Sequence, residues 1–228
     1  MNQILKPHTQ TFDLIDIVTS SKPKKLFLFR FQLVCSLSVA LSLLISYSYT
    51  LYTNSKKENI SNVLLDNYNI SMLYANNEGV YATSLSPNEY AYADNNYFVI
   101  GVIQIEKIDI TYPILSEIND ELLKISTCRF YGPNPNEIGN LCIAAHNYKD
   151  YRFFSNLSKL ENDDIIKIYD LSGKELDYIV YYKYEVDANN FDCTSQETNG
   201  KREITLITCN SIKGKRVIVK AREASPLF

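Results

Sequence analysis

The sequence predicts a mostly β protein: a closed or nearly closed barrel, preceded by a helix long and apolar enough to span a membrane. Tyr is abundant at 18 residues, whereas Trp is absent and Gly and Pro number 7 each, a mixture that favours strands over long helices. From Tyr97 onward, short runs of β-branched and aromatic residues alternate with turn residues. Seven or eight such runs in roughly 130 residues are typical of a small barrel.

The predicted strands are separated by turn residues and, at one point, by a short helix. Leu157 and Leu160 lie at helical spacing from Phe153 or Phe154, which predicts one short helix packed on the barrel. A Ser-Gly pair at 172–173 predicts a hairpin turn. The strand-like runs cover residues 97–105, 108–115, 139–145, 164–171, 176–186, 203–209 and 216–221.

A run of apolar residues at 31–52 predicts a membrane anchor. No charged side chain occurs between Arg30 and Lys56. As a helix the run would be roughly 33 Å long, which matches the hydrocarbon core of a bilayer. Basic residues are denser before the run than after it, which predicts a single pass through the cell membrane with a cytoplasmic N-terminus. A cleaved signal peptide is the alternative, but its apolar core would be shorter and would end at a clear small-residue site.

Four segments follow from these patterns. Residues 1–30 are predicted to be cytoplasmic, 31–52 to form the anchor, 53–96 an extracellular stalk, and 97–228 the outer barrel domain. The stalk is rich in Asn, Ser, Tyr and Glu, and it carries a weak helical pattern that predicts partial order near the barrel. The apolar residues of that pattern are Ile60, Val63, Leu64 and Tyr68.

The charge balance disfavours several classes of partner. The chain has 23 Lys and Arg against 26 Asp and Glu, a net charge of −3. The part after residue 53 has 18 basic against 24 acidic residues, a net charge of −6. An acidic outer part does not bind nucleic acid, anionic lipid or an anionic wall polymer by charge alone.

Five cysteines are spread along the chain, and none belongs to a CxxC pair. A zinc site is therefore disfavoured, and no metal or other cofactor is predicted. Two disulfides could form outside the cell, but the low cysteine content disfavours a disulfide-stapled scaffold. At least one thiol is then available for chemistry. The cysteines are Cys35, in the anchor, and Cys128, Cys142, Cys193 and Cys209.

His146 and Cys209 each come at the end of a predicted strand. His146 is the one histidine of the outer domain, because His8 precedes the anchor. Arg216 opens the next strand after Cys209 across a polar turn, so a hairpin would place these two residues beside each other. Strand ends on a rigid barrel are suitable positions from which to direct side chains into a shared site.

Together these three side chains suffice for acyl transfer through a thiol. A free thiol is mostly protonated at neutral pH, and an adjacent imidazolium or guanidinium favours the reactive thiolate. A permanently charged arginine can also donate to a developing oxyanion. Taken singly, each residue could have a structural role instead. Cys209 could be a small buried apolar residue, His146 a hydrogen-bonded residue near the core, and Arg216 a solvated charge at a strand edge. By residue type alone, Arg202 or Arg222 could replace Arg216 in the catalytic argument.

Longer segments resemble the sortases, the membrane-anchored cysteine transpeptidases of Gram-positive bacteria. TLITC at 205–209, followed by RVIVKARE at 216–223, resembles the signature strand pair of that family. GNLCIAAHNYKDYRFFSNLSKLENDDIIKIY at 139–169 is similar to its histidine strand and the helix after it, and GVIQIEKIDITYPIL at 101–115 to its early strands. The resemblance covers residues 97–223, with His146, Cys209 and Arg216 in the family's order.

The resemblance implies an eight-stranded barrel in which Cys209 attacks the Thr–Gly bond of an LPxTG-like C-terminal sorting signal on a secreted protein. His146 would protonate the leaving amine. Arg216 would hold the substrate and the oxyanion, and Thr208 would line the oxyanion site. An amine from a cell-wall precursor or from another protein would then resolve the thioacyl enzyme, and no metal is needed for this chemistry.

Departures from the family's pattern bear on its subclass. Some relatives bind calcium through acidic loops; Glu137, Asp187 and Asp192 could be placed in that role, but a solvated acidic face is favoured. The stretch 186–202 is too short for the helical insertion of class B enzymes. Residues 54–96 contain no Asp-Pro-aromatic lid motif, which disfavours a lidded pilus polymerase. A class A or D-like enzyme is therefore favoured, although IEK at 105–107 lacks the proline that is common in the early strands of those classes.

Two other functions stay open. A papain-like thiol endopeptidase would use the same residue types, but those chains place Cys before His, the reverse of the order here. A non-catalytic anchored barrel that binds cell-wall polymer or a partner protein would leave Cys209 with a structural role. Labelling by a thiol-reactive peptide separates this last function from an enzyme.

Overall fold

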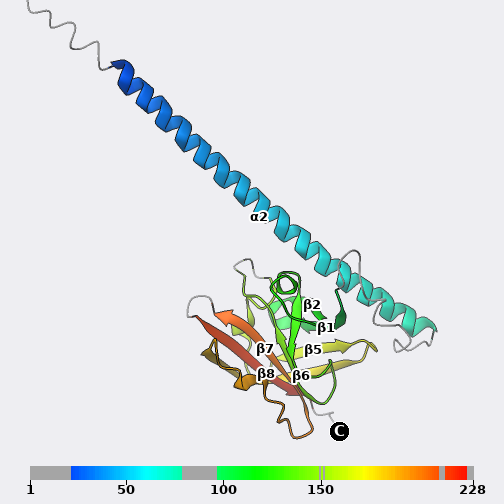
Figure 1. The fold of residues 1–228 in the computed structure, drawn as a ribbon. Helices are drawn as coiled ribbons and strands as arrows, with labels where there is room; N and C mark the ends of the chain where they lie inside the picture. Colours follow the sequence, from blue (N-terminus) through cyan, green and yellow to red (C-terminus); the bar gives the residue numbers. More distant parts are fainter. Residues whose placement is uncertain (1–21, 79–96, 149, 151, 211–213, 225–228) are drawn as a thin grey trace, which may run out of the picture. The chain divides into compact units, whose positions relative to one another are not determined.

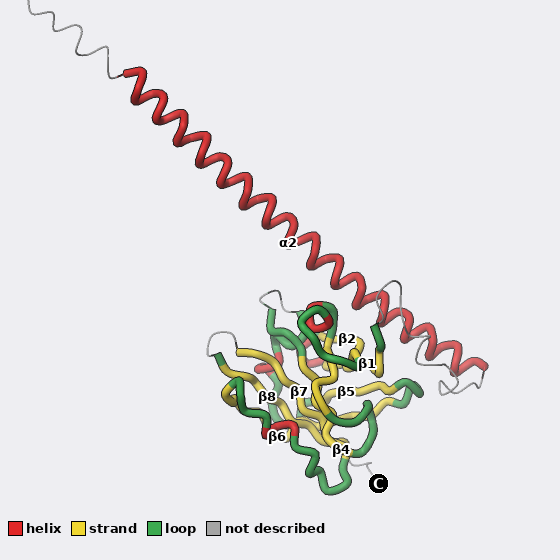
Figure 2. Tube along the Cα trace, viewed as in Figure 1, coloured by secondary structure: helices red, strands yellow, loops and turns green. Residues whose placement is uncertain are grey.

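The structure is a computed structural model that describes residues 22–78, 97–148, 150, 152–210 and 214–224. It divides into two compact units, Met1–Asn54 and Ser55–Phe228. The long helix α2 (Lys22–Glu78) runs through the boundary between them. The course of the chain is drawn in Figure 1, and its helices, strands and loops are distinguished in Figure 2.

In the first unit, the described part of α2 presents apolar side chains to its surroundings. From Leu26 to Tyr52 its large hydrophobic side chains range from 44% exposed at Leu33 to 72% at Phe27. Over the described residues, α2 is the one helix long and apolar enough to cross a membrane. A helix that is hydrophobic all round needs an apolar environment, which agrees with the anchor predicted at 31–52.

In the second unit, the end of α2 packs against the outside of the barrel. Leu64 and Tyr68 are buried in one cluster with Val102 and Leu115. The Tyr68 hydroxyl also donates to the backbone carbonyl of Asp170. The apolar pattern in the predicted stalk thus belongs to a docked helix; residues 79–96 of that stalk lie outside the described residues.

Eight strands form a closed barrel in the order β1-β2-β3-β4-β7-β8-β6-β5. Strand β5 closes the barrel by pairing antiparallel with β1. Pairs β2–β3 and β4–β7 are parallel, and the other pairs are antiparallel. The predicted closed barrel is confirmed. Its strands are β1 (Val99–Ile105), β2 (Ile110–Leu115), β3 (Thr127–Tyr131), β4 (Gly139–Ala144), β5 (Ile165–Asp170), β6 (Glu175–Asp187), β7 (Arg202–Asn210) and β8 (Lys215–Glu223).

Strand β3 is the one that the sequence patterns missed. Its five residues, TCRFY, include a charged side chain and do not stand out from the loops around them. Pairing with β2 and β4 on its two sides makes the segment a strand. The predicted short helix is present as a single 3-10 turn at Leu157–Lys159, with Leu157 and Leu160 buried. The hairpin turn at 172–173 is also found, with Gly173 at a φ of 77°.

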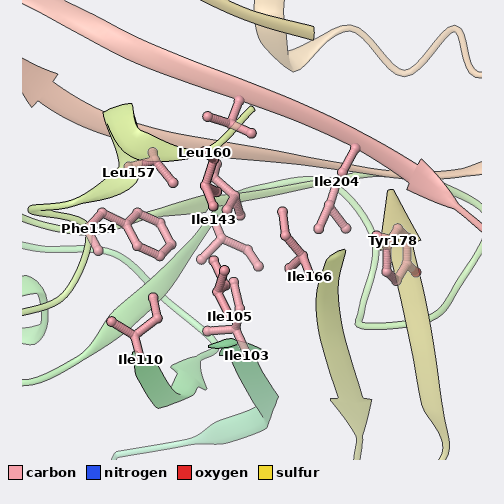
Figure 3. Close-up of a cluster of buried hydrophobic side chains, with 14 of the residues drawn as sticks. Ile103, Ile105, Ile110, Ile143, Phe154, Leu157, Leu160, Ile166, Tyr178 and Ile204 are labelled. Carbon is pink, nitrogen blue, oxygen red and sulfur yellow. The ribbon is translucent and has the colours of Figure 1, made fainter. Parts of the chain in front are cut away.

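Apolar side chains from several strands and from the segment after β4 fill the barrel interior, and Figure 3 labels some of them. Along β7, Ile204 and Leu206 belong to this interior cluster. Ile207 belongs instead to a separate cluster with Cys142 and Ile218. Because side chains alternate along a strand, Cys209 lies on the same outer face as Ile207. The alternation of β7 therefore directs Cys209 away from the core.

Candidate active site

Parallel pairing of β4 and β7 brings His146 beside the end of β7. The register pairs Ala144 with Ile207, the last pair of this ladder. Beyond it, the backbone N–H of Ala145 donates to the Ile207 carbonyl at 3.1 Å, and the Thr208 hydroxyl donates to the Ala145 carbonyl at 2.8 Å. His146 is the next residue after Ala145, so it lies next to the strand end that carries Cys209.

Asn147 connects the histidine segment directly to Cys209. Its side-chain amide donates to the backbone carbonyl of Cys209 at 2.7 Å. On the other side of this segment, the N–H of Phe154 donates to the His146 carbonyl at 3.1 Å. His146 therefore lies between Ala145 and Asn147, and both of these neighbours are hydrogen-bonded to the end of β7. No sequence pattern assigned Asn147 to the site; its position directly after the histidine was the available signal.

The β7–β8 hairpin places Arg216 directly opposite Cys209 in the strand register. Residues opposite each other in an antiparallel pair point to the same face, with Cβ atoms about 4.5–5.5 Å apart. Thiol and guanidinium therefore extend from one face, at the barrel end where His146 lies. The three residues come from β7, β8 and the segment after β4, and the structure brings all of them together.

Cys209 differs from the other cysteines of the second unit in its accessibility. Cys209 is exposed, whereas Cys128, Cys142 and Cys193 are buried. Burial raises the pKa of the Cys128 thiol and of the Cys142 thiol to about 12, and it raises the pKa of Cys193 as well. Deep, protonated thiols react slowly, so Cys209 is the cysteine of this unit that reagents and substrates can reach.

The environment of His146 favours its neutral form. Partial burial lowers the pKa of the imidazole, the nearby Asp120 raises it in opposition, and Lys124 lowers it slightly. The Tyr148 ring lies 5.0 Å from the imidazole, centroid to centroid, and the Arg152 guanidinium lies 4.8 Å from the centroid of that tyrosine. A neutral imidazole can accept a proton from a thiol and return it to an amine.

One aromatic ring contacts the Arg216 guanidinium, and a second ring supports the first. The guanidinium carbon lies 4.6 Å from the centroid of the Phe191 ring. Phe191 in turn stacks on Phe130 of β3, with centroids 6.0 Å apart and an interplanar angle of 4°. Phe191 lies in the connection between β6 and β7, where no sequence pattern marked it as part of the site.

An apolar surface borders the three polar residues. The outer cluster of Cys142, Ala144, Cys193, Ile207 and Ile218 lies on the face that carries Cys209 and Arg216. Other hydrophobic side chains pack against this cluster and stay partly exposed, so the site combines reactive groups with an apolar surface that suits an extended peptide. These are Ile118, Leu123, Phe130, Tyr184 and Val186.

Thr208 is buried beside the nucleophile candidate, and its hydroxyl donates a hydrogen bond to the Ala145 carbonyl.

The acidic residues considered for calcium each have another partner: Glu137 accepts from Asn134, Asp187 lies 3.9 Å from the Lys215 ammonium, and Asp192 accepts from Asn190. Within the described ranges, no three His, Cys, Asp or Glu side chains group in a way that could hold a metal ion.

Comparison with known families identifies the family of the barrel unit. The model of the family described as Sortase domain matches residues 103–224, more than half of the chain. The chain belongs to the sortase family. The match includes all four residues singled out from the sequence, His146, Thr208, Cys209 and Arg216, and every strand of the sortase barrel from β2 to β8.

Individual sortases show the same relationship. Sortase A of Bacillus anthracis is 33% identical over 124 residues, which are 53% of this chain and 58% of that relative, so less than two thirds of its length is matched. A Clostridium perfringens sortase D5 transpeptidase superposes with a TM-score of 0.61 at 24% identity, over 74% of this chain and 100% of that one. Corynebacterium diphtheriae sortase A gives a TM-score of 0.52 at 21% identity, over 76% and 90%. The shared fold is an eight-stranded barrel.

Proposed function

We propose that this sortase is a membrane-anchored cysteine transpeptidase that cleaves an LPxTG-like C-terminal sorting signal and transfers the protein to an amine. The observation that carries the proposal is the accessible Cys209, opposite Arg216 and beside the histidine segment at one barrel end. The acceptor is an amine of a cell-wall precursor or of another protein. A class A or D-like subclass is part of the proposal.

The residues divide the chemistry between them. Cys209 Sγ gives up its proton to His146 and attacks the carbonyl carbon of the Thr–Gly bond, while Arg216 donates to the developing oxyanion. The C–N bond then breaks and the C–S bond remains, as His146 returns the proton to the leaving glycine amine. In the second half, the acceptor amine attacks the thioester, its proton passes to His146, and the Cys209 thiolate leaves.

Thr208 lines the part of the site where the oxyanion would form. In the resting structure its hydroxyl bonds the Ala145 carbonyl and so joins the end of β7 to the histidine segment. The amide of Asn147 makes a second connection across the same junction. Both bonds restrict the separation of His146 and Cys209, which a proton transfer between the two side chains requires.

Cleavage of a peptide library built on LPxTG tests the proposal. The full chain in detergent should cleave at least one peptide, form a thioester adduct visible by mass spectrometry, and turn over faster with hydroxylamine, which intercepts the adduct. Cys209→Ala should abolish cleavage and adduct. Cys128→Ala is the matched control, because that thiol is buried in the cluster that the end of α2 covers. Undiminished cleavage by Cys209→Ala would refute the proposal, and a rate unaffected by hydroxylamine would favour an endopeptidase.

A further inference from the structure

In the described part of the chain, an aromatic ring restrains Arg216 and no acidic side chain pairs with it. Its guanidinium carbon lies 4.6 Å from the centroid of the Phe191 ring. Over the described residues, its side chain forms no ion pair and no hydrogen bond. Val186 of β6 lies opposite Arg216, and the acids on either side of Val186 have other contacts: Asp187 lies 3.9 Å from the Lys215 ammonium, and Glu185 accepts from Asn210. Among the residues that the structure describes, no protein acceptor therefore takes up the N–H groups of Arg216.

Phe191 is held firmly although its ring is 47% exposed. It precedes the 3-10 turn Asp192–Thr194, and its carbonyl accepts from both the backbone N–H and the hydroxyl of Thr194, at 2.9 and 2.8 Å. The buried amide of Asn140 donates to the carbonyls of Cys193 and Ser195, both at 3.0 Å, and so fastens this turn to β4.

A second ring supports Phe191 from behind. Phe130 of β3 stacks on it nearly parallel, at 4° and 6.0 Å between centroids. Arg216, Phe191 and Phe130 thus come from β8, the β6–β7 connection and β3, three segments that are far apart in the sequence. A ring that is held by its backbone and by a stacked neighbour can limit the positions of a flexible arginine side chain.

We propose that Phe191 is a positioning residue of this sortase: its ring holds the Arg216 guanidinium beside Cys209 and leaves the arginine charged and able to donate. A carboxylate in the same place would neutralise the guanidinium and occupy its N–H groups. An aromatic face attracts the cation without accepting its protons in conventional hydrogen bonds. The inference rests on the proposed function, since the oxyanion that Arg216 would stabilise forms during transpeptidation.

The test compares Phe191→Leu and Phe191→Trp with a control, Tyr182→Leu, in the full chain in detergent. Tyr182 is also an exposed aromatic residue, at 54%, and it stacks on Tyr184 rather than on an arginine. The first readout is the ¹H–¹⁵N signal of the Arg216 Nε–H group in arginine-labelled protein. A ring beneath the guanidinium should shift this proton upfield in the wild type; Phe191→Leu should remove the shift, and the control should keep it.

The second readout is the turnover of the sorting peptide selected from the library. Phe191→Leu should lower kcat about three- to thirty-fold with little change in KM, since the strength of cation–π contacts corresponds to such factors. Phe191→Trp should restore most of kcat, and Tyr182→Leu should match the wild type. In an Arg216→Ala background, where single-turnover adduct formation is measured, Phe191→Leu should have no further effect.

Several results would overturn the inference. An Arg216 Nε–H signal that is the same in the wild type and in Phe191→Leu would show that the ring does not hold the guanidinium. A rise in KM with kcat unchanged, or an equal loss in the Arg216→Ala background, would make Phe191 a contact for the peptide. Failure of the proposed function can be told apart from failure of this inference. If the proposed function is wrong, the wild type cleaves no peptide, but the nuclear magnetic resonance signal still shows whether the Phe191 ring lies against the Arg216 guanidinium.

Discussion

At the scale of single residues, His146 combines two opposing influences on its charge. Partial burial lowers the pKa of its imidazole, and the Asp120 carboxylate nearby raises it. Because burial is the larger effect, the folded protein binds a proton at this residue less readily than the unfolded chain does. Between the lowered pKa and the ordinary value near 6.5, the unfolded state therefore holds more protons.

This imbalance predicts how stability depends on pH. Neutral His146 makes its full contribution to the free energy of unfolding above pH about 6.5. That contribution is lost as the pH falls through this value toward the lowered pKa. The free energy of unfolding, measured in urea at a series of pH values between 7.5 and 5, should fall more steeply for the wild type than for His146→Gln. Asp120→Asn, which removes the opposing charge, should make the fall steeper still. Parallel curves for wild type and His146→Gln would contradict the prediction.

At the scale of elements, the end of α2 is part of the barrel unit. Leu64 is 2% exposed and Tyr68 5% exposed, and both pack with residues of β1 and β2. Val63, one position earlier, is 47% exposed. One face of this helix therefore covers apolar surface of the barrel that would otherwise meet water, which contributes to stability in proportion to the area covered.

Removing that contact should destabilise the barrel. Leu64→Ala is expected to lower the free energy of unfolding by about 3 kcal/mol, the range typical of a buried leucine that leaves a cavity. Val63→Ala, the matched control, removes an exposed side chain and should change stability by less than about 0.5 kcal/mol. Urea denaturation followed by tyrosine fluorescence gives both values. Equal, small losses in the two variants would show that the helix does not support the barrel.

At the scale of the whole molecule, the accessibility of the cysteines gives a way to determine membrane topology. Cys209 is exposed, while the other three cysteines of its unit are buried. Cys35 lies within the apolar helix predicted to be in the bilayer, where a polar reagent does not reach it. The charges flanking the apolar run predict that the barrel unit lies outside the cell.

A membrane-impermeant maleimide should therefore label the full chain in intact cells at Cys209 alone. Cys209→Ala should abolish this labelling, which identifies the site. After the maleimide is quenched, mass spectrometry of the digested protein identifies the labelled cysteine in the wild type and in Cys209→Ala. Labelling that occurs only after the cells are lysed would place the barrel on the cytoplasmic side, and labelling that persists in Cys209→Ala would show that one of the buried thiols becomes accessible.

The sequence by itself determined the strand content, the apolar anchor pattern and the short list of reactive residues, because alternation and apolar run length are local properties. It also determined the apposition of Cys209 and Arg216, since a hairpin joins neighbours in the chain. Only the tertiary structure decided that the segment with His146 lies beside the end of β7, that β3 is a strand, and that Phe191 lies against Arg216. Those contacts join segments distant in sequence, and pairing between such segments, rather than any local pattern, brings them together.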